Sequence, residues 1–105
     1  MLETAQASGV LDLVKRFVES ERKAFPVAEA YLFGSWAYGS PDSASDIDVG
    51  LVLEGEVSPL DESAIFSDAQ DFNVRIETHV FSKAYFDGAR KSIVYDIKEK
   101  GIKIA

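Results

Sequence analysis

Residues 46–53 alternate strictly between two kinds of side chain, and this pattern constrains the fold more than any other part of the sequence. One set recurs at every second position and is entirely aliphatic: Ile47, Val49, Leu51 and Leu53. The other set lies between them: Asp46, Asp48, Gly50 and Val52. Successive side chains of a β-strand point to opposite faces of the sheet. The segment therefore predicts a strand with one apolar face and one face that carries two carboxylates.

Other segments with regular spacing place this strand in a mixed fold. The predicted helices cover 10–24, 61–71 and 87–100. The other predicted strands cover 27–33, 73–81 and, at the end of the chain, 102–104. Asp61 and Asp87 are the candidate N-caps of the second and third helices, and Ile65 and Phe66 are expected to face the core. This order favours an α/β (α+β) fold, a small mixed β-sheet with helices packed on one face.

The chain has the size and composition of one folded domain. It contains 105 residues, 47% of them hydrophobic and 28% charged, which favours a single domain over residues 1–105. A formal net charge of −7, with scattered basic residues, argues against binding to long nucleic acid or to a membrane surface. Cysteine is absent, residues 1–8 lack signal-peptide character and no apolar run could span a bilayer, so we expect a cytoplasmic protein.

The carboxylate-bearing face of the predicted strand 46–53 suits a hard cation. Asp46 and Asp48 point the same way from one strand, and their like charges repel unless a cation or ample water lies nearby. Converging oxygen ligands are the donors that Mg²⁺ prefers, and the ion keeps further positions for water and substrate phosphate. The pair therefore predicts a magnesium site.

The polar segment 34–45 precedes this strand and has the composition of a loop, with one helical turn predicted over 35–38. Gly34 leaves room for the close approach of a triphosphate. Ser35 offers a hydroxyl group and exposed backbone N–H groups at the start of that turn. Together with the aspartates, these two residues would hold a metal-bound triphosphate from two sides.

The pattern Gly34-Ser35, ten residues, then Asp46-x-Asp48 closely resembles the signature of the DNA polymerase β-like nucleotidyltransferases. The small size resembles the minimal (MNT) branch of that superfamily, and the resemblance covers nearly the whole chain. It implies the polymerase β-like fold and an enzyme that transfers a nucleoside monophosphate to an acceptor hydroxyl, with ATP as the foremost donor of AMP. It also implies Mg²⁺ as the cofactor, in a site for two ions.

The resemblance assigns roles to individual residues. Asp46 and Asp48 would bind the two metal ions, with Glu77 as the third catalytic and metal-binding carboxylate. Gly34 and Ser35 would bind the nucleotide. Glu77 also lies on the polar face of the predicted strand 73–81, which agrees with a role beside the aspartates. A glutamate at this position departs from the family pattern, in which aspartate is more common.

The roles of several other polar and aromatic side chains are left open. His79 shares a strand face with Glu77, although a lone histidine in a strand is more often structural. Arg75, on the same face, is expected with equal weight to neutralise the carboxylates or to reach a phosphate. Trp36 and Tyr38 are expected to pack rather than to stack on a base, and Tyr38 stands where many family members carry a basic residue. Other acids that could join the site are Asp68, Asp71 and Glu54.

A partner protein is also implied by the resemblance. Minimal nucleotidyltransferases are often encoded beside HEPN-domain proteins, and some act as antitoxins that attach AMP to a tyrosine of the HEPN toxin. A HEPN-type partner therefore follows for this chain, in a homo- or hetero-oligomer, and the acidic charge fits a protein better than a polynucleotide. The alternative is a catalytically weak or inactive binding module that neutralises its partner by contact, and Glu77 and Tyr38 keep this alternative open.

Overall fold

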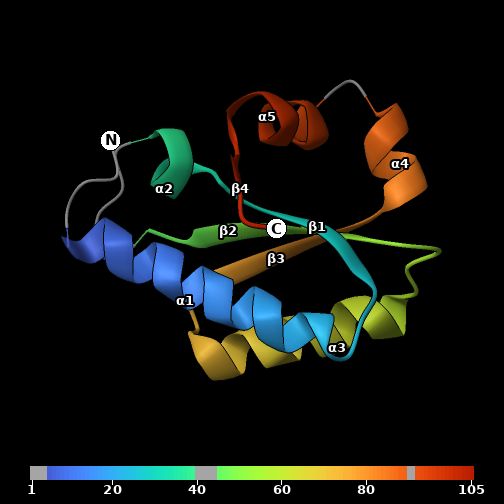
Figure 1. Ribbon diagram of the computed structural model, residues 1–105, viewed down its shortest axis with the longest axis horizontal. Helices are drawn as coiled ribbons and strands as arrows, with labels where there is room; N and C mark the ends of the chain where they lie inside the picture. The colour runs from blue at the N-terminus through green and yellow to red at the C-terminus, as the bar shows by residue number, and fades with distance from the viewer. Residues whose placement is uncertain (1–4, 40–44, 90–91) are drawn as a thin grey trace.

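The structure, a computed structural model, describes residues 5–39, 45–89 and 92–105 (Figure 1). The helices are α1 (Ala5–Arg22), α2 (Ser35–Tyr38), α3 (Pro59–Phe72), α4 (Lys83–Gly88) and α5 (Ser92–Lys100). The strands are β1 (Val27–Phe33), β2 (Ile47–Leu53), β3 (Ile76–Ser82) and β4 (Ile102–Lys103). Among the described residues, no helix combines the length and the hydropathy needed to cross a bilayer.

The four strands form one mixed sheet in the order β3-β2-β1-β4. β1 pairs antiparallel with β2 and with β4, and β2 pairs parallel with β3. The register places Asp48 between Phe33 of β1 and Glu77 of β3. The predicted α/β class with a small mixed sheet is confirmed, and β2, which carries the alternating pattern, is a central strand.

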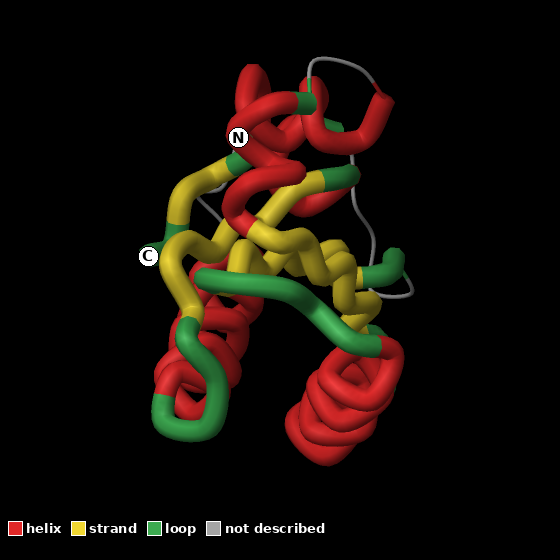
Figure 2. Tube along the Cα trace, turned by 90° about the vertical axis from the view of Figure 1, so that its right-hand side faces the viewer, coloured by secondary structure: helices red, strands yellow, loops and turns green. Residues whose placement is uncertain are grey.

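Helices cover both faces of this sheet (Figures 1 and 2). α1 and α3 pack on the face that carries Leu51, and their core includes Phe17. α4 and α5 pack on the opposite face, against a smaller buried cluster that contains Val52 and Phe86. The sequence predicted helices on one face of the sheet; this is true of α1 and α3, whereas α4 and α5 form a second layer on the other face. The second layer removes apolar side chains of the carboxylate-bearing face from water, and Val52 is fully buried beneath it.

The start of α3 differs from its prediction. Ser58, not Asp61, is the N-cap: its hydroxyl accepts from the Asp61 N–H, and the Asp61 carboxylate accepts from the Ser58 N–H. Such a reciprocal pair satisfies two helix-end donors at once, so the helix begins at Pro59, two residues earlier than predicted. Ile65 is fully buried as expected, but Phe66 is 49% exposed, which corrects its predicted place in the core.

The predicted C-terminal helix is two helices. Ser82 caps α4 by accepting from the Tyr85 N–H, and Ala89 leaves the helical conformation with φ −76° and ψ 141°. Asp87, the predicted N-cap, lies inside α4, where its carboxylate accepts from Lys83 Nζ at 2.9 Å. Because Asp87 lies inside α4, no helix begins directly after it, and the prediction that Asp87 is an N-cap is wrong.

A buried acid connects α1 to α3. Glu21 is 2% exposed, and its Oε1 has no hydrogen-bond partner among the described residues. Burial, together with a hydrogen bond and the like charge of Asp68, raises the pKa of Glu21 from 4.5 to about 8. Folded protein therefore keeps a proton on Glu21 at neutral pH, where unfolded protein has lost it.

This proton makes stability depend on pH. Between the unfolded and folded pKa values of Glu21, the free energy of unfolding is expected to fall by roughly 1 kcal/mol for each unit that pH rises. Glu21→Gln removes the titrating group, so chemical denaturation between pH 5 and pH 9 should show a flatter profile than wild type and higher stability at the alkaline end. Glu19→Gln, an exposed change on the same helix, serves as the control. Parallel profiles for wild type and Glu21→Gln would contradict the assignment.

Candidate functional site

Two carboxylates of neighbouring strands face each other on the sheet. Asp48 of β2 pairs directly with Glu77 of β3, so both side chains project from the same face. The Asp48 side chain is 22% exposed and that of Glu77 is 55% exposed. Like charges directly opposite each other on a sheet are destabilising, so this pair favours a cation between them.

His79 brings a third potential ligand to the pair. It lies two residues beyond Glu77 on β3, with its Nε2 3.5 Å from Asp48 Oδ1 and 3.3 Å from Glu77 Oε1. Nε2 is buried, and neither contact is aligned as a hydrogen bond. The ring rests edge-on against Phe33, with centroids 5.0 Å apart, which fixes its orientation. A buried nitrogen without a hydrogen-bond partner, between two carboxylates, makes Asp48, Glu77 and His79 a candidate cation site.

The electrostatics of the cluster agree with this geometry. Close contact with the Asp48 carboxylate raises the pKa of His79 against the opposing effect of burial, and the negative charges of Asp48 and Glu77 add to the rise. When it is protonated, the ring supplies positive charge between the two carboxylates, and when it is neutral, Nε2 is free to bind a cation.

Gly34 is the point where the loop after β1 touches the carboxylate. It has φ +73°, a conformation that side-chain-bearing residues rarely adopt, and a Cβ built there would overlap Oδ2 of Asp48. The pairing of Phe33 with Asp48 brings Gly34 to this place, because Gly34 follows Phe33 directly. The backbone therefore passes in contact with the Asp48 carboxylate only because residue 34 has no side chain.

The helical turn α2 begins immediately after this glycine, at the predicted residues. No side chain caps its N-terminal end at Gly34, and Ser35 is its first residue. The first N–H groups of a helix have no partner inside it, so Ser35 and its neighbours can donate to an anion beside Asp48. Trp36 is 2% exposed, which confirms its predicted packing role. The Tyr38 side chain lies outside what the structure describes.

Asp46 lies apart from the cluster. Among the described residues, the ligand atoms that lie within 4.8 Å of one another come from Asp48, Glu77 and His79. β2 begins at Ile47, so Asp46 belongs to the connection before the strand, and it is exposed. Its role as a metal ligand therefore stays a prediction. The other acids considered, Glu54, Asp68 and Asp71, are also outside this group.

Arg75 and Trp36 hold the backbone that leads to Asp46. Arg75 donates from Nε and from an Nη atom to the Ser45 carbonyl, at 3.1 and 2.9 Å, and Trp36 Nε1 donates to the same oxygen at 3.3 Å. The guanidinium also lies over the Trp36 ring, 5.5 Å from its centroid. This contact differs from both roles expected for Arg75, which were to neutralise the carboxylates or to reach a phosphate. The side chain instead fixes the start of β2.

The donor set of the cluster fits a divalent cation. Two carboxylates suit Mg²⁺ or Mn²⁺, and an imidazole nitrogen broadens the set towards transition metals. The exposed side of Glu77 leaves room for water or substrate oxygen to complete the coordination. The residues present therefore agree with a metal-dependent site next to an anion-binding turn.

Sequence comparison gives the family. A profile of the nucleotidyltransferase domain matches residues 11–104, which include every residue of the cluster. The chain belongs to this family. No curated protein is similar enough to count as a match. The nucleotidyltransferase domain thus accounts for nearly all of the described chain.

Solved structures agree with the fold of this nucleotidyltransferase domain. A candidate nucleotidyltransferase from Sulfolobus solfataricus is 24% identical, with a TM-score of 0.66 over 98% of this chain and 89% of its own. A toxin–antitoxin structure with AMP-PNP is 15% identical, with a TM-score of 0.62 over 87% of this chain and 72% of its own. A mutant of the toxin–antitoxin pair MntA–HpeT is 13% identical, with a TM-score of 0.60 and the same coverage of 87% and 72%.

Two residues, His79 and Arg75, have a larger part in the structure of the site than the sequence predicts. For His79, the signal was present, because the residue lies at position i+2 from Glu77 and therefore on the same strand face. For Arg75 there was no local signal, since its acceptor, Ser45, lies 30 residues earlier in the chain. Contacts of that kind depend on the tertiary fold.

Loss of the Arg75 contact should weaken cation binding at the candidate metal site. Arg75→Met keeps an unbranched apolar stem but removes both guanidinium donors to the Ser45 carbonyl, so the segment that carries Asp46 loses two charged hydrogen bonds and keeps the one from Trp36. We expect affinity for Mn²⁺, measured by electron paramagnetic resonance titration, to fall about tenfold, the size expected for losing charged hydrogen bonds. Arg16→Met, at an exposed arginine of α1, is the matched control and should bind as wild type does. Equal affinities for both variants would show that the contact does not support the site.

Proposed function

We propose that this domain is a Mg²⁺-dependent nucleotidyltransferase that moves a nucleoside monophosphate, foremost AMP from ATP, onto a hydroxyl group of a partner protein. The observation that carries the proposal is the Asp48–Glu77 pair, with the buried Nε2 of His79 aimed between the carboxylates and Gly34 in contact with Asp48. Membership of the nucleotidyltransferase family supports the reaction class.

In this proposal, Asp48 and Glu77 hold the cation, with Asp46 as a further ligand from the adjoining loop. Mg²⁺, when bound there, would polarise the phosphates and make the acceptor hydroxyl more acidic. Gly34 lets the triphosphate approach Asp48 closely, and the N–H groups at Ser35 donate to its oxygens. Both sets of contacts would hold the triphosphate beside Asp48 and Glu77.

The reaction forms one bond and breaks one. The acceptor oxygen attacks the α-phosphorus in line, the bond from that phosphorus to the bridging oxygen breaks, and pyrophosphate leaves. The proton of the acceptor hydroxyl passes to the Glu77 carboxylate, which is the most exposed member of the cluster. Glutamate is longer than aspartate by one methylene, and Glu77 can reach the incoming hydroxyl from β3.

We further propose that the acceptor is a tyrosine of a HEPN-type toxin and that the domain acts as its antitoxin in the cytoplasm, where ATP and Mg²⁺ are abundant. The fold is shared with structures of toxin–antitoxin pairs, one of them with AMP-PNP. A domain of this size has little room for an acceptor-binding module of its own, and a protein acceptor that brings its own surface suits it.

A second candidate is a binding module that neutralises a partner by contact without transferring a nucleotide. The observation in its favour is the position of His79, whose protonated ring can take the place of a cation between Asp48 and Glu77. In that case the cluster is a structural ion pair of the sheet, and neither ATP nor Mg²⁺ is needed.

Intact-mass spectrometry separates the two candidates. A HEPN-domain protein, if one is encoded beside this gene, would be incubated with the domain, Mg²⁺ and ATP, and a gain of roughly 329 Da would mark one AMP on the acceptor. The gain should disappear with Asp46→Asn or Asp48→Asn and when the metal is chelated. A stable complex that gains no mass with any nucleoside triphosphate would favour the binding module instead.

A further inference from the structure

One edge of the sheet is open beside the cluster. β3 is the outermost strand, next to β2 only. The Ile47 N–H donates to the Arg75 carbonyl, and in a parallel ladder this register turns the backbone groups of Glu77, His79 and Phe81 towards β2. Those of Thr78 and Val80 then point outwards, away from the sheet. The Ile76 N–H donates to the Asn73 carbonyl and the Ile76 carbonyl accepts from Gln70 Nε2. In the middle of the described strand, Thr78 and Val80 are therefore the residues whose outward backbone groups are left to pair.

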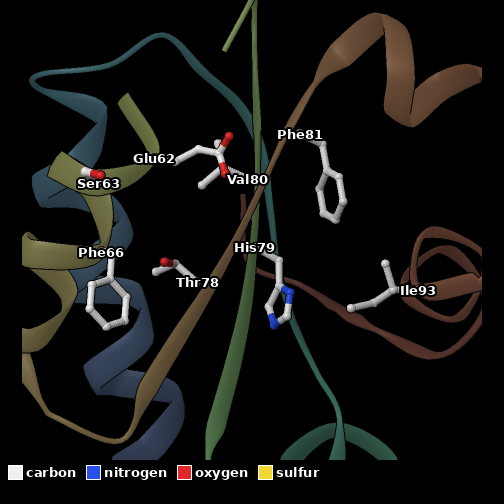
Figure 3. A pocket seen from close by; sticks show the side chains of 8 residues that line it. All are labelled: Glu62, Ser63, Phe66, Thr78, His79, Val80, Phe81 and Ile93. Atoms are coloured by element: carbon white, nitrogen blue, oxygen red, sulfur yellow. The ribbon is translucent and has the colours of Figure 1, made fainter. Parts of the chain in front are cut away.

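A groove runs along this edge. One hollow of about 450 Å³ has its floor on residues 78–81 of β3 and its walls on α3 and α5, which contribute Phe66 and Ile93 (Figure 3). A second hollow of about 380 Å³ continues to Ser82 and Tyr85, and shares Glu62, Val80 and Phe81 with the first. Shared walls make the two hollows one path, which begins at His79 and follows the strand.

The edge carries little of the usual protection against pairing with another strand, apart from the charge of Glu77. Exposed edge strands generally contain proline or lysine, or are covered, because unpaired backbone attracts other strands. Residues 76–82 contain neither proline nor lysine, and in Figure 3 the strand runs between α3 and α5. An edge left in this state next to a reactive centre is suited to pairing with another chain.

The side chains that line the groove indicate what kind of segment could bind in it. Phe66 is 49% exposed and faces the groove, and Phe81 and Ile93 also line it, so the path accepts apolar side chains. The charged side chains that line the two hollows, apart from His79, are Glu56 and Glu62. Acidic walls with apolar patches fit an extended segment in which aliphatic residues alternate with lysine or arginine.

The groove also leads to the cluster. Residues directly opposite each other on neighbouring strands have Cβ atoms about 5 Å apart, so a side chain added beside Glu77, on the same face, would reach the two carboxylates. The strand that fills the groove would therefore place its own hydroxyl-bearing residue at the site of transfer. Val80 and Thr78 would supply the backbone hydrogen bonds that set its register.

We infer that the partner binds by adding an extended, basic and aliphatic segment to the free edge of β3, with its acceptor hydroxyl opposite Glu77. The hydroxyl as acceptor rests on the proposed function, whereas the pairing of the segment with β3 does not. Main-chain hydrogen bonds to Thr78 and Val80 give this binding its affinity, and the acidic walls give it its charge preference.

Val80 allows a matched pair of variants. Val80→Pro removes the outward N–H and places a ring on the edge, while the hydrogen bonds to β2 remain because they come from neighbouring residues. Val80→Ala shortens the side chain but keeps the N–H. Comparing the two separates the backbone contact from the packing of Val80 against the core.

The probes are two pools of synthetic peptides of about ten residues, enough to span the groove. Each peptide carries one central tyrosine, with lysine or arginine alternating with valine, threonine or isoleucine. The second pool has the same sequences with every second backbone amide N-methylated. Retention on immobilised protein, without nucleotide or metal, would be quantified by mass spectrometry.

We expect wild type and Val80→Ala to retain the unmodified pool about tenfold better than the N-methylated pool, and Val80→Pro to retain both equally. Equal retention of the two pools by wild type would overturn the inference, and that comparison requires no variant to fold. So would an unchanged preference in Val80→Pro, or a wild-type dimer that Val80→Pro converts to monomer, since a second copy would then occupy the edge. The intact-mass experiment on the partner protein is read beside this one. A preference for the unmodified peptides together with no AMP transfer to the partner would refute only the proposed function. Asp48-dependent transfer to the partner without a peptide preference would refute only the inference.

Discussion

Asp48→Asn is expected to lower the rate of nucleotidyl transfer about a thousandfold, the scale of losing a metal ligand at a charged transition state. The amide keeps the shape of the carboxylate and removes its repulsion with Glu77 across the β2–β3 pair, so the fold should persist. AMP incorporation would be measured over a range of Mg²⁺ concentrations, with thermal unfolding of the same preparations. A folded but inactive variant at every Mg²⁺ concentration is the expected result.

Asp71→Asn is the matched control for this change. It makes the same substitution at an exposed acid of α3, outside the cluster, and should transfer AMP at the wild-type rate. If Asp48→Asn keeps most of its activity, Asp48 does not bind the ion on which AMP transfer depends. A loss of activity that accompanies unfolding would instead make Asp48 part of a structural ion pair with His79.

Gly34→Ala is expected to damage both stability and activity, and more severely than its size suggests. The new Cβ would overlap Oδ2 of Asp48, and the backbone at φ +73° is strained for alanine, at a cost of about 1–3 kcal/mol. Because Asp48 must turn away or the loop must move, transfer should fall at least a hundredfold, about 3 kcal/mol of lost transition-state stabilisation. Thermal unfolding and AMP transfer would be measured together.

Gly55→Ala separates the two causes. Gly55 also has a positive φ, +78°, but a Cβ there meets no atom within 4 Å. It should therefore lose stability through the backbone alone and keep its rate of transfer. Equal activity in the two alanine variants would show that close approach of residue 34 to Asp48 has no part in the reaction.

Local patterns predicted most of the elements well. The bounds of β1 and of the short helix α2 agree with the sequence prediction, because Pro26 and the glycines at 34 and 39 mark their ends. The period-two pattern identified β2 almost to the residue. Where two local signals competed, the prediction failed: Ser58 rather than Asp61 caps α3, and the final helix divides after Gly88.

Tertiary contacts account for what the sequence could not reveal about the site. Alternation placed Asp48 and Glu77 on polar faces, but only the parallel register of β2 and β3 brings them together. The same register sets His79 beside them. Val52 appeared on a polar face by its position, yet α4 and α5 bury it, and no local pattern marks which face of a strand will gain a second layer.

The placement of Asp48 and Glu77 has a consequence for the cohesion of the sheet. Within the described chain, β2 is hydrogen-bonded on both sides and β3 on one side only. An ion shared by the two carboxylates would join the outer strand to the central one as a cross-link does, and a ligand that binds only the folded state stabilises it. Slower hydrogen exchange of the β3 amides would then report that the ion has bound, before any product is made.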